Sequence, residues 1–217
     1  MGLKLYSRGV FIKDEAKEIV SDHFRFIRGV VDSDDLSLNI SREILQEDKQ
    51  METLKKSVDK KIKATLTTML EKDRETYEKF YDEFGGQLKY GCYDNFGINK
   101  DILIDLLLFK STKEDKYVTL KEYKERMKKD QKEIYFASGE TIDKIKKQPQ
   151  LEQVLDKGYE VLYFLDQVDE FMVSIINEYD GKKFKSIQKG DLDLGTKEEK
   201  KFECHLNVGH CIFCAQC

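Results

Sequence analysis

Apolar residues recur at helical spacing through much of the first half of the chain. The clearest stripe predicts one long amphipathic helix over residues 41–72, with its apolar face on a core. Its members are Ile44, Met51, Leu54, Val58, Ile62, Leu66 and Met69. An aromatic face follows on a second helix, formed by Tyr77, Phe80, Tyr81 and Phe84. Acidic neighbours favour aromatic packing over base stacking there, and Gly85-Gly86 is expected to end the helix.

The N-terminal residues alternate between strand and helix patterns. Residues 3–12 predict a strand, residues 14–23 a short helix and residues 27–32 a second, buried strand. A strand, helix, strand order predicts a parallel, right-handed unit. Two strands are too few to be stable alone.

The second half of the chain reads as a small α/β unit. Residues 102–109 predict a buried helix, and Thr119 with Glu122 predicts a capping box that opens a helix to about Lys128. Residues 133–137, 159–165 and 184–188 predict strands, and residues 141–156 and 167–179 predict helices. This βαβαβ order predicts a three-stranded parallel sheet with helices packed against it.

The charge balance restricts the function. Of 217 residues, 38 are basic and 42 acidic, for a net charge of −4. This balance leaves no broad cationic surface for nucleic acid or anionic lipid. The longest apolar run, residues 102–109, is too short to span a membrane, and the N-terminus lacks the apolar stretch of a signal peptide. We expect a cytoplasmic protein with no nucleic-acid or membrane partner.

Four of the five cysteines lie in the last fourteen residues: Cys204, Cys211, Cys214 and Cys217. Their spacing is compatible with zinc, and a zinc or redox activity there is one alternative. However, the segment has no apolar set that could pack around a metal. We therefore expect residues 196–217 to be an unstructured or non-native tail, the product of truncation, frameshift or cloning, and we expect no metal site.

The main candidate chemistry lies where an acidic loop leads into the long helix. If the turn is helical there, Asn39, Arg42 and Gln46 share one face, with two amides flanking a guanidinium. Donors beside free helix amides and the positive end of the helix dipole suit phosphate oxygens. The alternative is a solvated ion pair with Glu43 or Glu47, which would make Arg42 a structural anchor in a non-catalytic interaction module.

Residues 26–46 resemble the signature of the middle domain of the 90-kDa heat-shock chaperone family, in its bacterial type. Other stretches agree in the same order: Leu5-Tyr6-Ser7-Arg8, Glu78-Lys79-Phe80-Tyr81, Ile134-Tyr135-Phe136, Glu160-Val161-Leu162 and Asp169-Glu170. The resemblance covers about residues 3–195. The family has further strands ahead of this region, so the resemblance implies that the chain begins partway through a domain. The strand at residues 3–12 should then keep an unpaired edge.

The resemblance implies a role for each candidate residue. Arg42 would reach the terminal phosphate of ATP held by a separate N-terminal domain, and Asn39 and Gln46 would support the same catalytic loop. Arg8 would be an auxiliary cofactor-binding residue. ATP with Mg²⁺ is implied only for the full-length protein, and the isolated chain should bind no cofactor and catalyse nothing. The implied partners are the N-terminal ATP-binding domain and C-terminal dimerisation domain of the same protein, a second copy in a full-length homodimer, and unfolded client proteins.

Two positions depart from the family pattern. Ser37 stands where proline is usual, so nothing fixes φ at that point of the loop. Gly9 stands where a second basic residue commonly follows Arg8, which puts an auxiliary phosphate role of that strand in doubt.

The expected fold class is α/β, or an α+β mix. It combines a two-stranded remnant of an αβα sandwich, long helices and a small three-layer βαβαβ domain. The expected division is residues 1–40 for the remnant with the catalytic loop, 41–130 for a helical connector, 131–195 for the small αβα part, and the tail. A further alternative is a self-contained enzyme with a nucleotide site at the strand ends of the small sheet, but the sequence evidence for such a site is weak. The turn Ser138-Gly139-Glu140-Thr141 has one glycine and puts a glutamate where a phosphate would sit.

Overall fold

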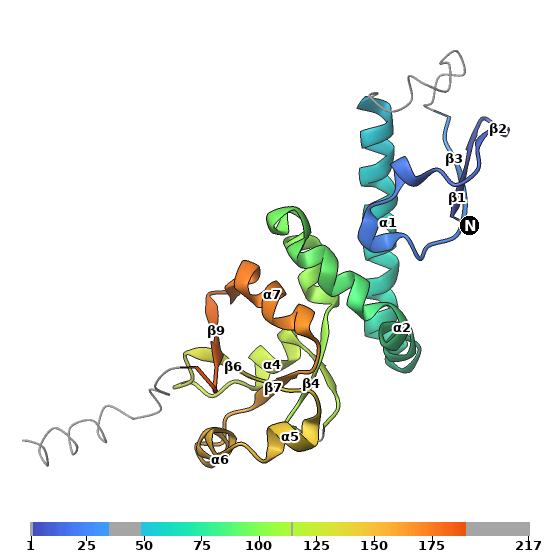
Figure 1. Ribbon diagram of the computed structural model, residues 1–217. Coiled ribbons are helices and arrows are strands. Elements are labelled where there is room, and N and C mark those ends of the chain that lie inside the picture. The colour runs from blue at the N-terminus through green and yellow to red at the C-terminus, as the bar shows by residue number, and fades with distance from the viewer. Residues whose placement is uncertain (1, 35–48, 114, 190–217) are drawn as a thin grey trace, which may run out of the picture.

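The computed structural model describes residues 2–34, 49–113 and 115–189. Within these ranges the chain forms two α/β parts joined by the long helices α1 (Lys49–Lys72) and α2 (Arg74–Tyr93) (Figure 1). The N-terminal part contains a three-stranded sheet, and the C-terminal part contains a six-stranded sheet. The prediction of a mixed α/β fold is confirmed.

The N-terminal sheet is a hairpin with one added parallel strand. Its strands are β1 (Leu3–Ser7), β2 (Val10–Lys13) and β3 (Gly29–Asp32), in the order β2-β1-β3. β1 pairs antiparallel with β2 and parallel with β3. The parallel pairing is the one that the strand, helix, strand order predicted for residues 3–12 and 27–32. Alternate residues of β1 point to one face, so Leu3 and Leu5 are buried in the core.

Several details of this part differ from the sequence prediction. Residues 3–12 form two strands, because Arg8 and Gly9 adopt positive φ and reverse the chain. β1 is therefore the central strand, paired on both sides, while β2, which falls in the same predicted range, lies at the edge of the sheet. The sheet has three strands, where a two-stranded remnant was predicted. β3 was predicted to be buried, yet it is an edge strand and Val30 is 64% exposed.

Residues 14–23 form no α-helix. They form two short 3-10 helices, Lys17–Ile19 and Asp22–Phe24, because Val20 between them is extended with φ −139° and ψ 140°. The apolar positions of this region are nevertheless buried. Ala16 is 1% exposed and Ile19 is fully buried, so the apolar pattern correctly predicted burial while giving the wrong helix type.

Helix α1 carries the predicted apolar stripe. Met51, Ile62 and Leu66 are buried, and Leu54, Val58 and Met69 pack against the same core. The helix ends at Lys72, as predicted. Residues 41–48 of the predicted helix lie outside the part of the chain that the structure describes.

Helix α2 has the predicted aromatic face but a different end. Tyr77 is fully buried and its hydroxyl donates to the carbonyl of Leu106 at 2.6 Å. The rings of Phe80 and Phe84 lie 5.4 Å apart. Gly85-Gly86 does not end the helix, which continues to Tyr93. A Cβ on Gly85 would lie 2.7 Å from the Tyr81 ring, so the glycine permits close packing inside the helix.

Residues 102–109 form no single buried helix. They are divided among α3 (Lys100–Leu103), a 3-10 helix (Ile104–Leu106) and β4 (Leu108–Ser111). Leu107, Leu108 and Phe109 are all at most 2% exposed. A short apolar run cannot distinguish a buried strand from a buried helix by periodicity, and here its last two residues, Leu108 and Phe109, belong to the sheet.

The C-terminal sheet has the strand order β5-β4-β7-β6-β9-β8. Its centre consists of β7 (Val161–Phe164), β6 (Glu133–Ser138) and β9 (Lys182–Ser186), all parallel, as predicted. The prediction of only three strands is wrong. The chain adds β4, β5 (Tyr117–Thr119) and β8 (Glu178–Tyr179) through antiparallel pairs.

Helices cover both faces of this sheet. Ile134 and Phe136 of β6 join the core that contains α2 and α7 (Gln167–Ile176). Tyr135 and Ala137, on the opposite face, join the core under α5 (Ile142–Lys146) and α6 (Pro149–Asp156). The alternation along β6 therefore produces three layers, as the βαβαβ pattern predicted.

Three helix boundaries in this part can be compared with the sequence. The capping box of Thr119 and Glu122 opens α4 (Leu120–Arg126), as predicted. The helix predicted at 141–156 is two helices, because Pro149 cannot continue a preceding helix and instead starts α6. The helix predicted at 167–179 ends at Ile176, where Asn177 adopts φ 58°. No helix in the described ranges has the length and hydropathy needed to cross a membrane.

The two neighbouring glycines of α2 provide a matched test of the packing. We expect Gly86→Ala to raise the free energy of unfolding by about 0.5–1 kcal/mol, because the site is open and alanine favours helix. Gly85→Ala should lower it by about 1–3 kcal/mol, because the new methyl group meets the Tyr81 ring. Urea unfolding of the two variants measures both values, and an equal gain in both would contradict the close packing of Gly85.

Candidate functional site

The three residues that the sequence placed in a catalytic loop lie outside the described residues. Asn39, Arg42 and Gln46, together with Ser37, all fall within residues 35–48. Both flanks of this segment are described, since Asp34 precedes it and α1 begins at Lys49. Contacts at these flanks show how the segment is attached to the fold.

The turn between β1 and β2 contacts the end of β3. Arg8 and Gly9 have φ values of 50° and 75°, as in the two-residue turns that join tight hairpins. The Gly9 N–H donates to both carboxylate oxygens of Asp32, at 3.1 and 3.3 Å. Glycine suits this position because a residue with a side chain would be strained at φ 75°. The departure from the family pattern at Gly9 thus coincides with a backbone contact to β3.

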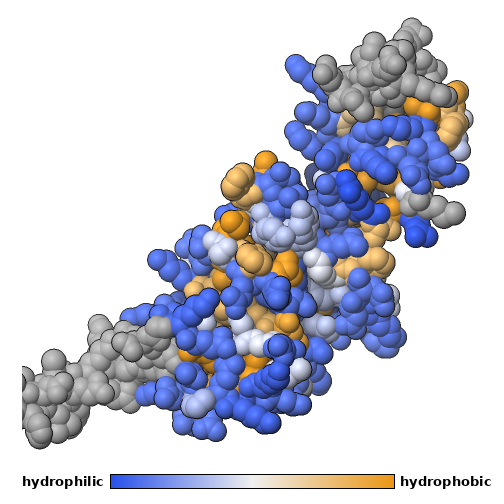
Figure 2. Space-filling model, in the orientation of Figure 1, coloured by the Kyte–Doolittle hydropathy of each residue, from blue (hydrophilic) through white to orange (hydrophobic). Residues whose placement is uncertain are grey.

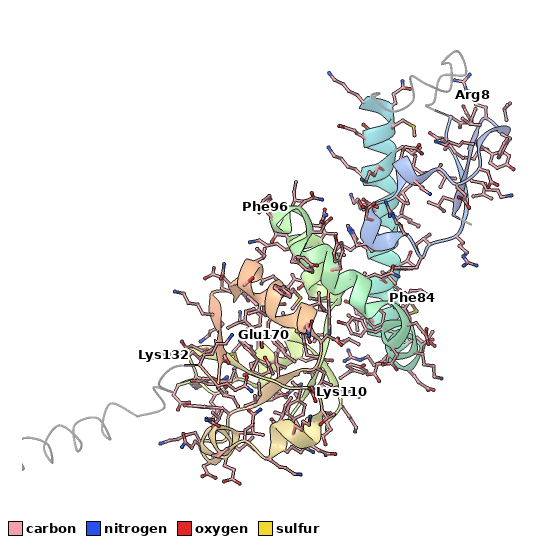
Figure 3. All side chains as sticks on the ribbon, in the orientation of Figure 1. Arg8, Phe84, Phe96, Lys110, Lys132 and Glu170 are labelled. Carbon is pink, nitrogen blue, oxygen red and sulfur yellow. The ribbon has the colours of Figure 1, made fainter. Side chains whose placement is uncertain are left out.

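Arg8 contacts the backbone just before the candidate loop. Its Nε donates to the carbonyl of Asp34 at 3.3 Å. Figure 3 shows Arg8 at the end of the N-terminal sheet, and the residue is exposed. Among the residues described, this bond ties the turn to Asp34. The cofactor-binding role of Arg8 stays a prediction.

Helix α1 is also fixed on the N-terminal part, about three turns after its first residue. The Asp59 carboxylate accepts the Ser21 N–H at 3.2 Å and the Ser21 hydroxyl at 2.5 Å. Met51, near the first turn of α1, is buried in the core. The end of β3, where the segment begins, is therefore held by side-chain contacts, and the buried Met51 fixes the start of α1, where the segment ends.

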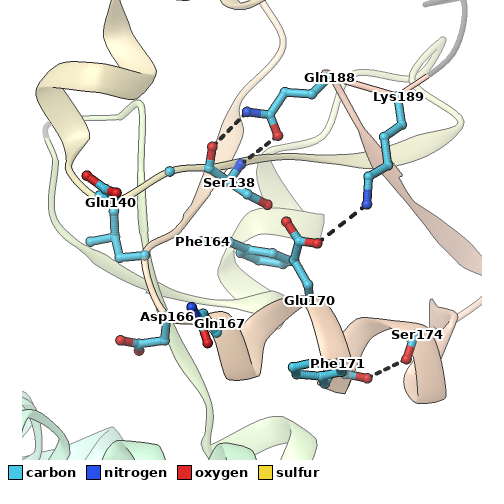
Figure 4. A pocket seen from close by; sticks show the side chains of 12 residues that line it. Ser138, Glu140, Phe164, Asp166, Gln167, Glu170, Phe171, Ser174, Gln188 and Lys189 are labelled. Atoms are coloured by element: carbon cyan, nitrogen blue, oxygen red, sulfur yellow. Dashed lines mark hydrogen bonds and ion pairs between the residues drawn. The ribbon is translucent and has the colours of Figure 1, made fainter.

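A crevice opens at the carboxyl ends of β6, β7 and β9 (Figure 4). We call it the strand-end crevice; its volume is about 780 Å³ and its lining includes Ser138, Glu140, Phe164, Glu170, Phe171 and Lys189. In parallel α/β sheets, ligands bind where neighbouring connections leave in opposite directions. From β6 the chain passes to β7 on one side and then to β9 on the other, so this crevice lies at such a point.

Polar groups around the crevice are ordered by contacts to Ser138. The Gln188 amide accepts the Ser138 N–H at 3.2 Å and donates to its carbonyl at 2.7 Å. The Ser138 hydroxyl and the Lys189 ammonium hold the pKa of Glu170 below its usual value. Ionised Glu170 together with Glu140 disfavours phosphate here, in agreement with the weak nucleotide signal of this turn.

A buried ion pair joins α2 to α7. The Lys89 Nζ lies 2.8 Å from a carboxylate oxygen of Asp166 and 2.8 Å from one of Asp169. The side chains of Lys89 and Asp169 are only 9% and 1% exposed. Burial raises the pKa of Asp169 despite the nearby ammonium. Asp166 and Asp169 also form the capping box of α7, so Lys89 contacts the start of that helix.

Large apolar side chains are exposed where the end of α2 meets α7. We call this area the α2–α7 surface and define it by Tyr93, Phe96, Ile98 and Phe171. Phe96 is 96% exposed, Ile98 75% and Phe171 62%, and the rings of Tyr93 and Phe171 lie 6.3 Å apart. Figure 2 shows apolar side chains gathered at this end of α2.

The backbone under Phe96 is strained. Asn95 and Phe96 have φ values of 48° and 58°, which a bulky residue rarely adopts. The turn is nevertheless packed firmly on α7, because a Cβ on Gly97 would lie 2.5 Å from the Ile175 side chain. An exposed phenylalanine is therefore held in a defined position at a cost in backbone energy, and strain of this kind often marks a functional site.

Sequence reasoning missed this surface. Phe171 lies in a helix rich in apolar residues, and periodicity alone did not separate it from its buried neighbours Met172 and Val173. The Asn95-Phe96-Gly97 sequence does carry a signal, since asparagine and glycine favour left-handed turns. An aromatic residue at such a turn points away from a helix face.

Among the residues described, no three histidine, cysteine or acidic side chains gather as a metal site requires. Cys92 is buried inside α2, and burial raises the pKa of its thiol to about 12. This thiol is therefore protonated near neutral pH and unreactive. The four tail cysteines lie outside the described residues, so the prediction of no metal there stays a prediction.

Comparison with known proteins gives a consistent result. The family model described as "Hsp90 protein" matches residues 1–208. A chaperone protein HtpG of Clostridium perfringens is 55% identical over 208 residues, which are 96% of this chain and 33% of the relative. The chaperone protein HtpG of Bacillus subtilis is 54% identical over 200 residues, 92% of this chain and 32% of the relative. The chain thus spans about a third of the length of these relatives.

The contact between Gly9 and Asp32 can be tested in this chain. We expect Asp32→Ala to accelerate hydrogen exchange of the Gly9 amide about tenfold, because the N–H loses both acceptor oxygens. Asp34→Ala is the matched control, since Arg8 uses only the backbone carbonyl of Asp34. Equal exchange of Gly9 in the two variants would contradict the contact.

Proposed function

The chain belongs to the Hsp90 protein family, and on that premise we propose that it is the middle domain of an ATP-dependent molecular chaperone of the HtpG type. Supporting the proposal are the match over residues 1–208 and relatives that carry the name of chaperone protein HtpG. The ATP-binding and dimerisation domains would belong to the rest of the full-length protein. The division at residues 40, 130 and 195, the homodimer and the cytoplasmic location are part of this proposal.

Client contact is the part of the function that the geometry supports best. One observation carries it: three large apolar side chains of the α2–α7 surface are more than 60% exposed on a rigid turn and helix. Exposed apolar area of this kind marks sites that bind other proteins. Unfolded polypeptides expose apolar side chains that folded proteins bury, and a preformed aromatic surface binds them with little loss of its own conformational entropy.

The second part of the proposal assigns Arg42 to the terminal phosphate of ATP. Arg42 would act from outside the nucleotide pocket, with Asn39 and Gln46 supporting the same loop. A planar guanidinium can donate two parallel hydrogen bonds to phosphate oxygens and stabilise charge that develops in the transition state. The contacts of Asp32 and Arg8 support this role, because they hold the end of β3, where residues 35–48 begin.

A competing function is a non-catalytic interaction module in which Arg42 pairs with a carboxylate. Glu43 and Glu47 are the nearest candidates in sequence. This alternative predicts a loss of stability when Arg42 is removed, whereas the phosphate role predicts a loss of turnover. The two functions are therefore separable in one set of variants.

For Arg42 the test uses the full-length chaperone. We expect Arg42→Ala to lower ATP turnover about 10- to 100-fold and to leave nucleotide affinity nearly unchanged, because the contact forms mainly in the reacting complex. Arg42→Lys should restore little activity, since one ammonium cannot reproduce a bidentate contact. Arg28→Ala, at an exposed arginine of the same region, is the control. Normal turnover together with a lower melting temperature in Arg42→Ala would favour the structural anchor.

For client contact we expect Phe96→Ser and Phe171→Ser each to weaken binding of an unfolded polypeptide about five- to tenfold, because each removes apolar area that the complex would bury. Fluorescence anisotropy with a labelled, permanently unfolded protein measures this affinity. Leu155→Ser is the matched control, since Leu155 is 42% exposed on α6, away from the α2–α7 surface. Equal affinities in all three variants would contradict the proposed client contact.

A further inference from the structure

The strand-end crevice is continuous with the α2–α7 surface. Phe171 belongs to both, because it is exposed beside Tyr93 and also lines the crevice. Figure 4 shows Phe171 at the rim and Phe164 further inside. The volume of about 780 Å³ exceeds what a single side chain needs, and the inner wall of Phe164 and Leu165 is apolar. A polypeptide lying across Phe171 would therefore have room to place a neighbouring side chain in the crevice.

The charges around the crevice are unequal. Three carboxylates line it, those of Glu140, Asp166 and Glu170, against the single ammonium of Lys189. Lys89 forms ion pairs with both Asp166 and Asp169, so one ammonium group is shared by two carboxylates at the start of α7. With Lys144, which pairs with Glu140, also counted, four carboxylates face three ammonium groups around the crevice, and this excess of negative charge favours a cationic group.

Two of these carboxylates have partners that a ligand could replace. Lys189 lies 3.4 Å from Glu170, and their side chains are 76% and 45% exposed. Lys144 pairs with Glu140 one helical turn away, at side-chain exposures of 65% and 79%. Exposed pairs of this kind contribute little stability and exchange readily. A guanidinium that offers two parallel donors is a better partner for Glu170 than a distant ammonium.

We propose that the strand-end crevice binds an arginine or lysine side chain of the client segment whose neighbouring apolar residue lies on Phe171. The inference rests on the proposed client contact and adds to it a preference for basic segments. The cation would lie against Glu170, its aliphatic part would contact Phe164 and Leu165, and Lys189 would be displaced. Acidic segments would be disfavoured by the same carboxylates.

The test uses the full-length chaperone and two fluorescein-labelled, unstructured peptides. Both contain one phenylalanine, and the next residue is arginine in one peptide and the uncharged isostere citrulline in its twin. We expect the arginine peptide to bind about three- to fivefold more tightly at low salt, with the advantage falling at high salt. Glu170→Gln combined with Glu140→Gln should abolish the advantage and leave the citrulline peptide unaffected, whereas Lys189→Gln should increase it.

Controls separate this inference from the proposed function. Glu152→Gln changes an exposed carboxylate of α6, away from the crevice, and should preserve the arginine advantage. If the two peptides bind equally and Phe171→Ser weakens both, the preference is refuted while client contact stands. An advantage that survives in the Glu140→Gln, Glu170→Gln double variant also refutes the crevice as its source. Failure of both peptides to bind overturns both proposals.

Discussion

The C-terminal part of the chain depends on one buried cation. The Lys89 ammonium lies 2.8 Å from carboxylate oxygens of both Asp166 and Asp169, and Asp169 is almost completely buried. Both charges lose hydration at this place, so removing Lys89 would leave the Asp169 carboxylate uncompensated in the interior. Because the two aspartates also cap α7, the ion pair fixes where α7 begins and where it contacts α2.

This contact determines the position of the candidate client site. The α2–α7 surface takes Tyr93 and Phe96 from the end of α2 and Phe171 from α7, so it exists only while the two helices hold their relative position. The strand-end crevice shares α7 as one wall. A single electrostatic contact therefore supports two neighbouring candidate binding features, which are formed by residues far apart in the sequence.

The N-terminal part is held by analogous polar contacts to backbone groups. Asp59 of α1 accepts from Ser21, and Asp32 of β3 accepts from Gly9. On the helix side, Gly91 of α2 lies so close to His23 that a Cβ would come within 2.5 Å of it. The long helices thus connect the flanks of residues 35–48 to the α2–α7 surface through close packing (Figure 1). The two proposed activities are located at different ends of that connection.

The sequence by itself determined whatever depends on local pattern. The apolar stripe of α1, the capping box at Thr119 and the βαβαβ order could each be predicted, because spacing, caps and alternation act over a few residues. The phosphate role of Arg42 also rests on the sequence and its family resemblance, and it stays a prediction because residues 35–48 lie outside the described part of the chain. Only the tertiary structure decided that Gly85 continues a helix, that residues 108–111 join a sheet and that β1 is a central strand. Those outcomes depend on partners distant in the chain, as does the exposure of Phe171, because burial is a property of the packed molecule that helical spacing alone does not reveal.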